Sequence, residues 1–286
     1  MKVCRFRLAD PTPRLGLLNE AGTAVLDLSG AGLHSLAALL DEVSPVETLR
    51  RASAGRLPEH ALSAITFLAP VEHHEVWAAG VTYLRSKAAR MEESDFSATA
   101  YDRVYAAARP EIFFKSIAEK VVPTGGEVGI RRDATWNVPE PELALVLNSR
   151  GEVAGFTVGN DMSSRDIEGE NLLYLPQAKI YEGSCALGPW VTVGATEAAA
   201  REWTITLAID RNGARVFGGE TVVSQIKRTF QELAGYLFRS QRFPHGAVLL
   251  TGTGIVPTET FTLQPGDTIA ITISGIGTLK NTVSVV

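Results

Sequence analysis

The sequence predicts an α+β protein that is mainly β, with a small N-terminal α/β domain over residues 1–70 and a mixed β-sandwich or β-roll over residues 71–286. Two observations predict this fold class. Short apolar runs separated by glycine-marked turns recur after residue 110, whereas runs with helical spacing are few there. Strands and helices therefore do not alternate as they do in a doubly wound parallel sheet. A chain of 286 residues is long enough for one large domain and a smaller companion.

The expected N-terminal domain combines strands with two helices. Residues 1–8 alternate apolar and polar side chains until two nearby prolines break the pattern, which is typical of a strand. Residues 15–28 predict a β-hairpin with its turn at Asn19–Gly22. Apolar side chains at helical spacing predict two helices, over residues 33–43 and 46–55.

The second domain is predicted to consist mostly of strands and hairpins. Turn residues at Asn148–Gly151 and Asn212–Gly213, each between apolar runs, predict two hairpins. The expected elements, in chain order, are a strand over 75–83, a helical stretch over 101–110, a strand over 111–116, hairpins over 142–161 and 203–221, an amphipathic helix over 223–240, and strands over 246–254 and 267–277.

Composition and charge exclude several classes of protein. The net charge is −5, from 27 basic and 32 acidic side chains, and no basic stripe stands out, so we expect no nucleic-acid partner. No apolar run approaches the ~18–20 residues that a membrane-spanning helix needs. Cys4 and Cys185 lie far apart in no CxxC pattern, and the N-terminus lacks the apolar core of a signal peptide. These features predict a soluble cytoplasmic protein that does not contact membranes.

Three carboxylates stand at the ends of two predicted strands. Glu140 and Glu142 are two residues apart at the head of the apolar run LALVL, so both would point to one face of a strand. Asp161 follows a hairpin of matched length and would return to the same end. Like charges side by side need a neutralising partner, and Mg²⁺ or Mn²⁺ binds carboxylate oxygens while keeping positions open for water and substrate. The alternative is a solvated strand end that carries acidic side chains.

Three further residues are candidates for a site near these carboxylates. Lys179, between small residues and a glycine, is either a partly buried base or oxyanion clamp, or an ordinary surface lysine. Glu111 is either an acid–base group or the partner of Lys115 in a structural ion pair. Thr253 lies in the run TGTG, whose main-chain N–H groups and hydroxyl could hold a carboxylate; this signal is weak by itself.

Four motifs in order resemble the fumarylacetoacetate hydrolase family: residues 139–166, 177–190, 251–254 and 273–283. The resemblance covers about residues 75–286. It implies a mixed β-roll or sandwich with a smaller N-terminal domain, and a homodimer or homotetramer. It also implies that Glu140, Glu142 and Asp161 bind a divalent metal, usually Mg²⁺, and that Lys179 stabilises a developing enolate or oxyanion.

This sequence departs from the hydrolases of that family near residue 82. Thr82 replaces the asparagine of a Gly-x-Asn-Tyr motif, and Ser86 stands where those hydrolases carry the histidine that activates water. The segments GVTYLRS, RPEIFFK, which contains Glu111, and YLPQAKIYEG are similar to a subgroup of dehydratases that act on 2-keto-3-deoxy-pentonates. The subgroup implies a metal-dependent lyase that converts a substrate such as 2-dehydro-3-deoxy-D-arabinonate to 2,5-dioxopentanoate and water.

The resemblance suggests a role for each site residue. Lys179 would remove the C3 proton or stabilise the enolate, and Glu111 would protonate the leaving hydroxyl or move the C5 proton. Arg85 and Ser86 would contact the substrate hydroxyls, and Thr253 would hold the substrate carboxylate. Two alternatives remain: a hydrolase that cleaves the C–C bond of an acylpyruvate or a diketo sugar acid, and a non-catalytic protein that binds 2-keto acids.

Overall fold

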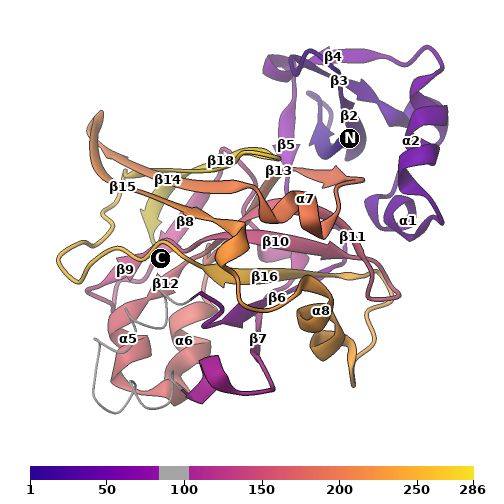
Figure 1. The fold of residues 1–286 in the computed structure, drawn as a ribbon. Helices are drawn as coiled ribbons and strands as arrows, with labels where there is room; N and C mark the ends of the chain where they lie inside the picture. Colours follow the sequence, from indigo (N-terminus) through magenta and orange to yellow (C-terminus); the bar gives the residue numbers. More distant parts are fainter. Residues whose placement is uncertain (84–102) are drawn as a thin grey trace.

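The computed structural model describes residues 1–83 and 103–286 of the chain, and most of its regular elements are strands (Figure 1). The larger sheet contains β1 (Lys2–Arg7), β2 (Arg14–Leu18), β3 (Ala24–Asp27), β4 (Glu59–Ala61), β5 (Thr66–Leu68), β6 (Glu75–Gly80), β7 (Glu111–Ser116), β10 (Pro141–Leu147), β11 (Val153–Asp161), β13 (Cys185–Val193) and β16 (Ala247–Thr253). The smaller sheet contains β8 (Glu127–Ile130), β14 (Thr204–Arg211), β15 (Ala214–Val222), β17 (Thr268–Ile273) and β18 (Gly277–Val285). A separate short pair joins β9 (Asn137–Val138) to β12 (Ser163–Ser164).

Helices are short and lie outside these sheets. The α-helices whose bounds lie wholly within residues 1–83 and 103–286 are α1 (Leu36–Asp41), α2 (Pro45–Ser53), α5 (Arg165–Glu170), α6 (Leu175–Lys179), α7 (Glu197–Arg201) and α8 (Phe230–Phe238). Residues 103–106 are also helical, within the helical stretch predicted over 101–110. Single 3₁₀ turns are η1 (Leu28–Ala31), η2 (Leu62–Ala64), η3 (Ala118–Lys120), η4 (Leu172–Tyr174) and η5 (Val223–Gln225). The predicted class, α+β and mainly β, is confirmed. Within residues 1–83 and 103–286, no helix is long and apolar enough to cross a membrane.

The larger sheet is mixed, because β16, a strand from late in the sequence, is parallel to one of its two neighbours. Its order is β4-β3-β2-β1-β13-β11-β10-β16-β6-β7, with β5 paired to β1. The strand β16 lies between β10, to which it is antiparallel, and β6, to which it is parallel. The other neighbours in this sheet are antiparallel. This insertion brings segments from residues 75–80, 141–161 and 247–253 side by side.

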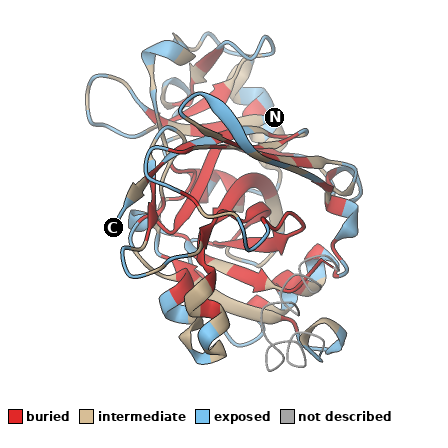
Figure 2. Ribbon diagram, turned by 90° about the vertical axis from the view of Figure 1, so that its left-hand side faces the viewer, coloured by how far each residue is buried: buried red, intermediate tan, exposed pale blue. Residues whose placement is uncertain are grey.

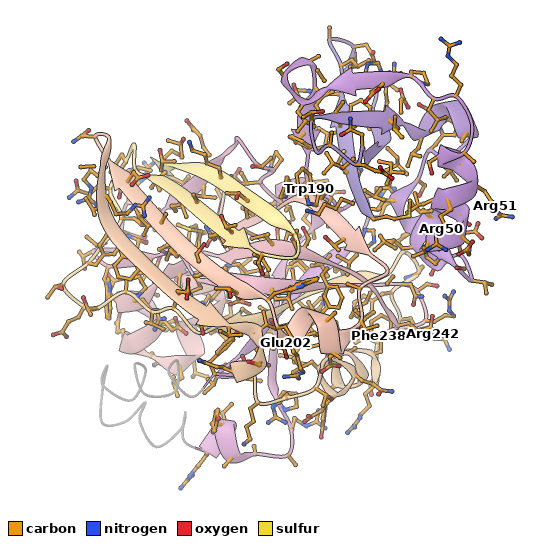
Figure 3. All side chains as sticks on the ribbon, turned by 45° about the horizontal axis from the view of Figure 1, so that its top comes forward. Arg50, Arg51, Trp190, Glu202, Phe238 and Arg242 are labelled. Carbon is orange, nitrogen blue, oxygen red and sulfur yellow. The ribbon has the colours of Figure 1, made fainter. Side chains whose placement is uncertain are left out.

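The N-terminal strands continue the larger sheet and do not form a sheet of their own. The predicted hairpin turn is present, since the N–H of Gly22 donates to the main-chain oxygen of Asn19 at 3.0 Å. The strand β1 pairs with β2 on one side and with β13 on the other. At this junction the indole N–H of Trp190 donates to the oxygen of Ile276 at 2.7 Å (Figure 3), and Phe67 meets its ring edge-on. The domain division at residue 70 stays a prediction.

Both hairpins predicted for the second domain are present. In the first, β10 and β11 are joined at Asn148–Gly151, where the N–H of Gly151 donates to the oxygen of Asn148 at 3.0 Å. In the second, β14 and β15 are joined by Asn212 and Gly213, with φ angles of 51° and 80°. Two successive positive φ angles are the requirement of the tight turn that an Asn-Gly pair favours.

The predicted helix over 223–240 is wrong in its first third. Residues 223–225 form η5, and α8 begins only at Phe230, where the Thr229 side chain accepts from the N–H of Glu232. The main-chain groups of residues 226–228 bond to other parts of the chain: the N–H of Lys227 donates to the oxygen of Thr82, and Arg201 donates to the oxygens at 226 and 228. These tertiary bonds replace the helical ones that the apolar spacing predicts.

The strand β10 is buried on both faces, which explains its unbroken apolar sequence. Its side chains at 143, 145 and 147 belong to the apolar core shared with β14 and β17 of the smaller sheet. Those at 144 and 146 belong to a second core, which includes Leu36, Leu39 and Leu40 of α1. Buried residues accordingly concentrate on the central strands (Figure 2). Burying a Leu or Val side chain fully contributes roughly 1.5–3 kcal/mol to the stability of the fold. The position of β10, including its first residues, is therefore firmly fixed.

Candidate metal centre

Five neighbouring strands of the larger sheet present candidate residues at the same end. Asp161 is the last residue of β11, and Glu142 lies at the start of the antiparallel β10. Thr253 is the last residue of β16, Gly80 the last of the parallel β6, and Glu111 the first of the antiparallel β7. The strand directions therefore gather residues that lie up to 173 positions apart in sequence.

The three predicted metal ligands lie together and are buried. Glu140, Glu142 and Asp161, here called the carboxylate trio, each offer an oxygen atom, and these atoms lie within 4.8 Å of one another. Hairpin register sets their places, because the N–H of Asp161 donates to the main-chain oxygen of Glu140 at 3.0 Å. The side-chain oxygen of Asn160 also accepts from the N–H of Glu140 at 3.2 Å. The alternative of a solvated strand end is wrong, since all three side chains are at most 3% exposed.

Glycine at position 252 brings a main-chain donor to the trio. The N–H of Gly252 donates to Oε2 of Glu142 at 2.6 Å. This residue has a φ of 89°, and a Cβ there would lie 2.2 Å from Oγ1 of Thr82. Only glycine satisfies both the left-handed backbone and the close approach. The Thr82 hydroxyl itself donates to the main-chain oxygen of Thr251 at 2.5 Å.

Three buried cations surround the trio. Nζ of Lys179, at the end of α6, donates to Oε2 of Glu140 at 2.7 Å and to Oδ2 of Asp161 at 3.2 Å. The guanidinium of Arg165, the first residue of α5, pairs with Oε1 of Glu140 at 3.0 Å. Nζ of Lys115 on β7 pairs with Oδ1 of Asp161, donates to the main-chain oxygen of Lys179, and reaches that of Met162 at 3.0 Å. Buried charges require such pairing to remain in a folded chain.

The donor set fits a hard divalent cation. Burial raises the pKa of the Glu142 carboxyl well above its usual range, and the neighbouring charges of Asp161 and Glu140 raise it further. Among the described residues, Glu142 is the member of the trio with no ion pair. A bound cation would stabilise its ionised form by direct attraction. Carboxylate oxygens without histidine or cysteine donors are the ligands that suit Mg²⁺ or Mn²⁺.

Glu111 on β7 is separated from Glu142 on β10 by the two strands β16 and β6, and it packs on a main-chain surface. It is paired with Gly80 in the register of β6 and β7. A Cβ on Gly80 would lie 2.0 Å from Oε2 of Glu111, so glycine leaves the space that this carboxylate occupies. The structural alternative, an ion pair between Glu111 and Lys115, is wrong because Lys115 pairs with Asp161.

Of the three predicted substrate-binding residues, Thr253 lies among the described residues. The Thr253 hydroxyl is buried within its own turn, where it accepts from the N–H of Ile255 and donates to the oxygen of the same residue, both at 3.2 Å. Its contact with a substrate carboxylate stays a prediction. Arg85 and Ser86 lie outside the described residues.

The sequence did not single out Lys115, Arg165 and Gly252 as members of this site. Lys115 carried a partial signal, as a charged residue inside the apolar strand EIFFKS, where a buried lysine needs a buried partner. Arg165 stands in the motif that also contains Asp161, yet no spacing rule links it to Glu140. Gly252 carried the plainest signal, since a glycine inside a strand often marks a close approach of another chain segment.

Sequence comparison identifies several similar proteins. A model of a protein family described as "Fumarylacetoacetate (FAA) hydrolase C-terminal" matches residues 75–284 of this chain. The chain is 48% identical over 217 residues to the Haloferax volcanii protein named "Probable 2-keto-3-deoxyxylonate dehydratase", covering 76% of this chain and 74% of that protein. It is 40% identical over 226 residues to 2-dehydro-3-deoxy-D-arabinonate dehydratase of Saccharolobus solfataricus, covering 78% and 76%.

A solved structure gives the same relationship in three dimensions. The structure titled "2-keto-3-deoxy-D-arabinonate dehydratase complexed with magnesium and 2,5-dioxopentanoate" is similar to this chain with a TM-score of 0.80. The two are 33% identical, and the match covers 100% of this chain and 99% of that one. The similarity therefore extends over both sheets and the N-terminal strands.

Proposed function

This chain belongs to the fumarylacetoacetate hydrolase family, and we propose that it is a metal-dependent dehydratase of 2-keto-3-deoxy-pentonates. The reaction converts a substrate such as 2-dehydro-3-deoxy-D-arabinonate to 2,5-dioxopentanoate and water. Its cofactor is Mg²⁺, or Mn²⁺ in its place, bound by the carboxylate trio. The chain is thus a hydro-lyase that acts on a small 2-keto sugar acid.

One observation carries this proposal: a single end of the larger sheet holds a buried carboxylate trio, a buried lysine against it, and a separate carboxylate beyond two intervening strands. The trio suits a metal, and Lys179 contacts two of its members. Glu111 lies on β7, beyond β16 and β6. Elimination of water from adjacent carbons needs one group for the C3 proton and another for the departing C4 hydroxyl, and this arrangement offers both.

When bound, the divalent ion would act as a Lewis acid towards the 2-keto carboxylate and make the C3 proton more acidic. Lys179 is proposed either to remove that proton as the neutral amine, becoming an ammonium group, or to hold, as the ammonium group, the negative charge that develops on the C2 oxygen. Two carboxylates contact its Nζ, and Lys115 donates a hydrogen bond to its main-chain oxygen; this fixed position at the trio supports the proposal. The fixed geometry matters, because catalytic groups lose effect steeply when they are misplaced by about 1 Å.

Glu111 is proposed to give a proton to the C4 hydroxyl as it leaves as water, or to move a proton from C5 afterwards. Loss of the C4 hydroxyl leaves a C3–C4 double bond. Removal of a C5 proton and addition of one at C3 then gives the enol of the C5 aldehyde, which tautomerises to the product. In neither step does a water molecule have to be activated as a nucleophile. The absence of a histidine at the position of Ser86 is therefore compatible with this reaction.

We further propose the contacts with the substrate, the cellular compartment and the oligomeric state. Arg85 and Ser86 would bind the substrate hydroxyls, and Thr253 would hold the substrate carboxylate, as the family motif at these positions suggests. The enzyme would act in the cytoplasm as a homodimer or homotetramer. Both cysteines are buried and free, which supports a reducing compartment. Light scattering after gel filtration measures the oligomeric state directly.

A product assay tests the proposal. The protein loaded with Mg²⁺ is incubated with the D and L forms of 2-keto-3-deoxy-pentonate, which differ only at C4, and, separately, with an acylpyruvate, each with and without a chelator. We expect release of 2,5-dioxopentanoate from a sugar acid, dependent on the metal. Pyruvate released from the acylpyruvate, with the sugar acids untouched, would instead identify a C–C hydrolase. Tight binding of oxalate without turnover of any keto acid would identify a non-catalytic binding protein.

A further inference from the structure

Two segments of the chain flank the contact between Gly80 and Glu111. One is 81–83, which directly follows β6, and the other is 103–110, the described residues that directly precede β7. Neither segment belongs to a sheet, so the strands alone do not fix them. The β6–β7 pairing sets Glu111 opposite Gly80, and what holds these two flanking segments supports that placement.

A third segment, Ile226–Arg228, holds the first of these two. Ile226 forms an isolated antiparallel bridge with Tyr83. The N–H of Lys227 donates to the main-chain oxygen of Thr82 at 3.1 Å. The Thr82 side chain in turn bonds to Thr251, one residue before the glycine whose N–H contacts the carboxylate trio.

The same segment holds the residues that precede Glu111. The guanidinium of Arg228 donates to the main-chain oxygen of Ala107 at 2.6 Å and to that of Ala108 at 3.2 Å. Nζ of Lys227 donates to the oxygen of Tyr105 and lies 4.3 Å from the centre of its ring. Two adjacent side chains therefore bind three carbonyl groups within seven residues of Glu111.

Arg228 is fixed in turn by its surroundings. It is 8% exposed, and its guanidinium also pairs with Glu232 in the first turn of α8. Its main-chain oxygen accepts from Arg201 at 2.7 Å, and Arg201 pairs with Glu197 at 2.8 Å. A planar guanidinium with several donors can hold two carbonyls and a carboxylate at once, which a lysine cannot do in the same geometry.

We propose that Arg228, supported by Lys227, is a positioning residue of the reaction that acts by fixing the Glu111 carboxylate. The inference rests on the proposed function, in which Glu111 transfers a proton. Arg228 donates to carbonyls three and four residues before Glu111, while the adjacent Lys227 anchors the segment that follows Gly80. Loss of the guanidinium would release the 107–108 carbonyls and let Glu111 shift from its place on Gly80. A shift of about 1 Å can lower the rate ~10²-fold.

The test is a double-mutant cycle between Arg228→Ala and Glu111→Gln, measured as kcat, KM and the dissociation constant for Mg²⁺. We expect Arg228→Ala to lower kcat about 10- to 100-fold. The Mg²⁺ dissociation constant should stay within about twofold of the wild-type value, because Arg228 makes no contact with the trio among the described residues. In the Glu111→Gln background the same substitution should lower kcat little further, since residues that act through one another are not additive.

A matched control separates positioning from general stability. Arg211, the last residue of β14 in the smaller sheet, pairs with the buried Asp267 and donates to the main-chain oxygen of Thr262, so it makes the same kinds of bond elsewhere. Arg211→Ala should lower the melting temperature but leave kcat within about twofold. Guanidinium chloride at low, non-denaturing concentration should restore part of the activity of Arg228→Ala. Arg228→Lys should lose less kcat than Arg228→Ala, and this milder variant carries the test if the alanine variant does not fold.

The possible outcomes are distinct. Additive losses of kcat in the cycle, or unchanged kcat in a folded Arg228→Ala variant, would overturn the positioning role. A wild-type protein that turns over no 2-keto-3-deoxy-pentonate would overturn the proposed function itself, before any variant is compared. A normal wild-type rate with an additive cycle would leave the dehydratase in place and remove Arg228 from its mechanism.

Discussion

Lys115 and Asp161 form an ion pair in which both side chains are buried. This pair joins β7 to the end of β11. The same ammonium group bonds to the main-chain oxygen of Lys179. One side chain thus orients a metal ligand through its carboxylate and a proposed catalytic lysine through its backbone.

Lys115→Met should destabilise the protein strongly, and metal should offset part of the loss. Removing one partner of a buried ion pair typically costs about 3–5 kcal/mol, because the other charge stays buried. Bound Mg²⁺ would compensate the negative charge of Asp161, whose Oδ1 loses its pairing with Lys115 in this variant. Urea unfolding in chelator and in saturating Mg²⁺ measures both effects. Lys120→Met, at an exposed position, is the control. It should change the free energy of unfolding neither in chelator nor in Mg²⁺. Equal losses with and without Mg²⁺ would contradict this account.

Glu142→Gln should abolish metal binding without destabilising the metal-free protein. The raised pKa of Glu142 means that its charge opposes folding when no cation is bound. A neutral amide keeps the shape and can still accept from the N–H of Gly252. Calorimetric titration with Mg²⁺ measures the loss of metal binding, and thermal unfolding in chelator measures the stability of the metal-free protein. The wild type should gain about 2.7 kcal/mol at a free Mg²⁺ concentration 100 times its dissociation constant, and the variant nothing.

Glu152→Gln is the matched control for that variant, because Glu152 lies at the exposed turn of the same hairpin. It should bind Mg²⁺ as the wild type does. Dehydratase activity that persists in chelator would remove the metal from the mechanism.

Lys179→Met should lower kcat about 10²–10³-fold while Mg²⁺ binds at least as tightly as before. The ammonium group contacts two members of the carboxylate trio, so its removal takes away a competing positive charge. Steady-state kinetics and calorimetric titration measure the two quantities. Lys280→Met, on the exposed side of β18, should match the wild type in both. A turnover rate close to that of the wild type would exclude Lys179 from the chemistry.

Gly80→Ala should lower kcat by displacing Glu111. The added Cβ would lie 2.0 Å from Oε2 of that residue, so the carboxylate has to move. We expect a loss of roughly 10²-fold in kcat with Mg²⁺ affinity retained. Gly235→Ala in α8 meets no atom within 4 Å and should keep full activity, with a gain in stability of up to about 1 kcal/mol. Wild-type kinetics in Gly80→Ala would show that the place of Glu111 is unimportant.

His74 should make the protein less stable as the pH falls from about 6.5 to about 4. Burial lowers the pKa of His74 to about 4. The unfolded chain, with a histidine pKa near 6.5, then binds more protons than the folded one in this window. Stability is fully present above about pH 6.5, and about 3 kcal/mol is lost by pH 4, at ~1.4 kcal/mol per pKa unit.

Urea unfolding in chelator from pH 7 to pH 4.5 checks this dependence. In His74→Asn the part of the slope due to this residue should vanish, since asparagine does not titrate and can still accept from the N–H of Glu72. His34→Asn, at an exposed position, should keep the wild-type slope. The prediction fails if His74→Asn and the wild type lose stability in parallel.

Local patterns predicted much of the fold and the metal ligands, because these depend on neighbours in sequence. The hairpin that joins β10 to β11 follows from alternation and a glycine turn, and its register alone brings Asp161 to Glu140. Lys115 and Arg165 were missed as members of the site because their partners lie 46 and 25 residues away. The helix over 223–240 was placed too early because Thr82 and Arg201 take up the main-chain groups at 226–228. No local pattern indicates that β16 lies between β10 and β6.

That placement of β16 has a consequence for synthesis on the ribosome. The strand ends at residue 253 of 286, whereas its neighbours β6 and β10 are made more than 100 residues earlier. Until it arrives, a nascent chain exposes one unpaired side on each of those strands and lacks the N–H group that contacts Glu142. The carboxylate trio therefore meets its main-chain donor only after residue 252 has been made. A ribosome-bound chain stalled before residue 247 would keep those strand edges open to pairing with other molecules.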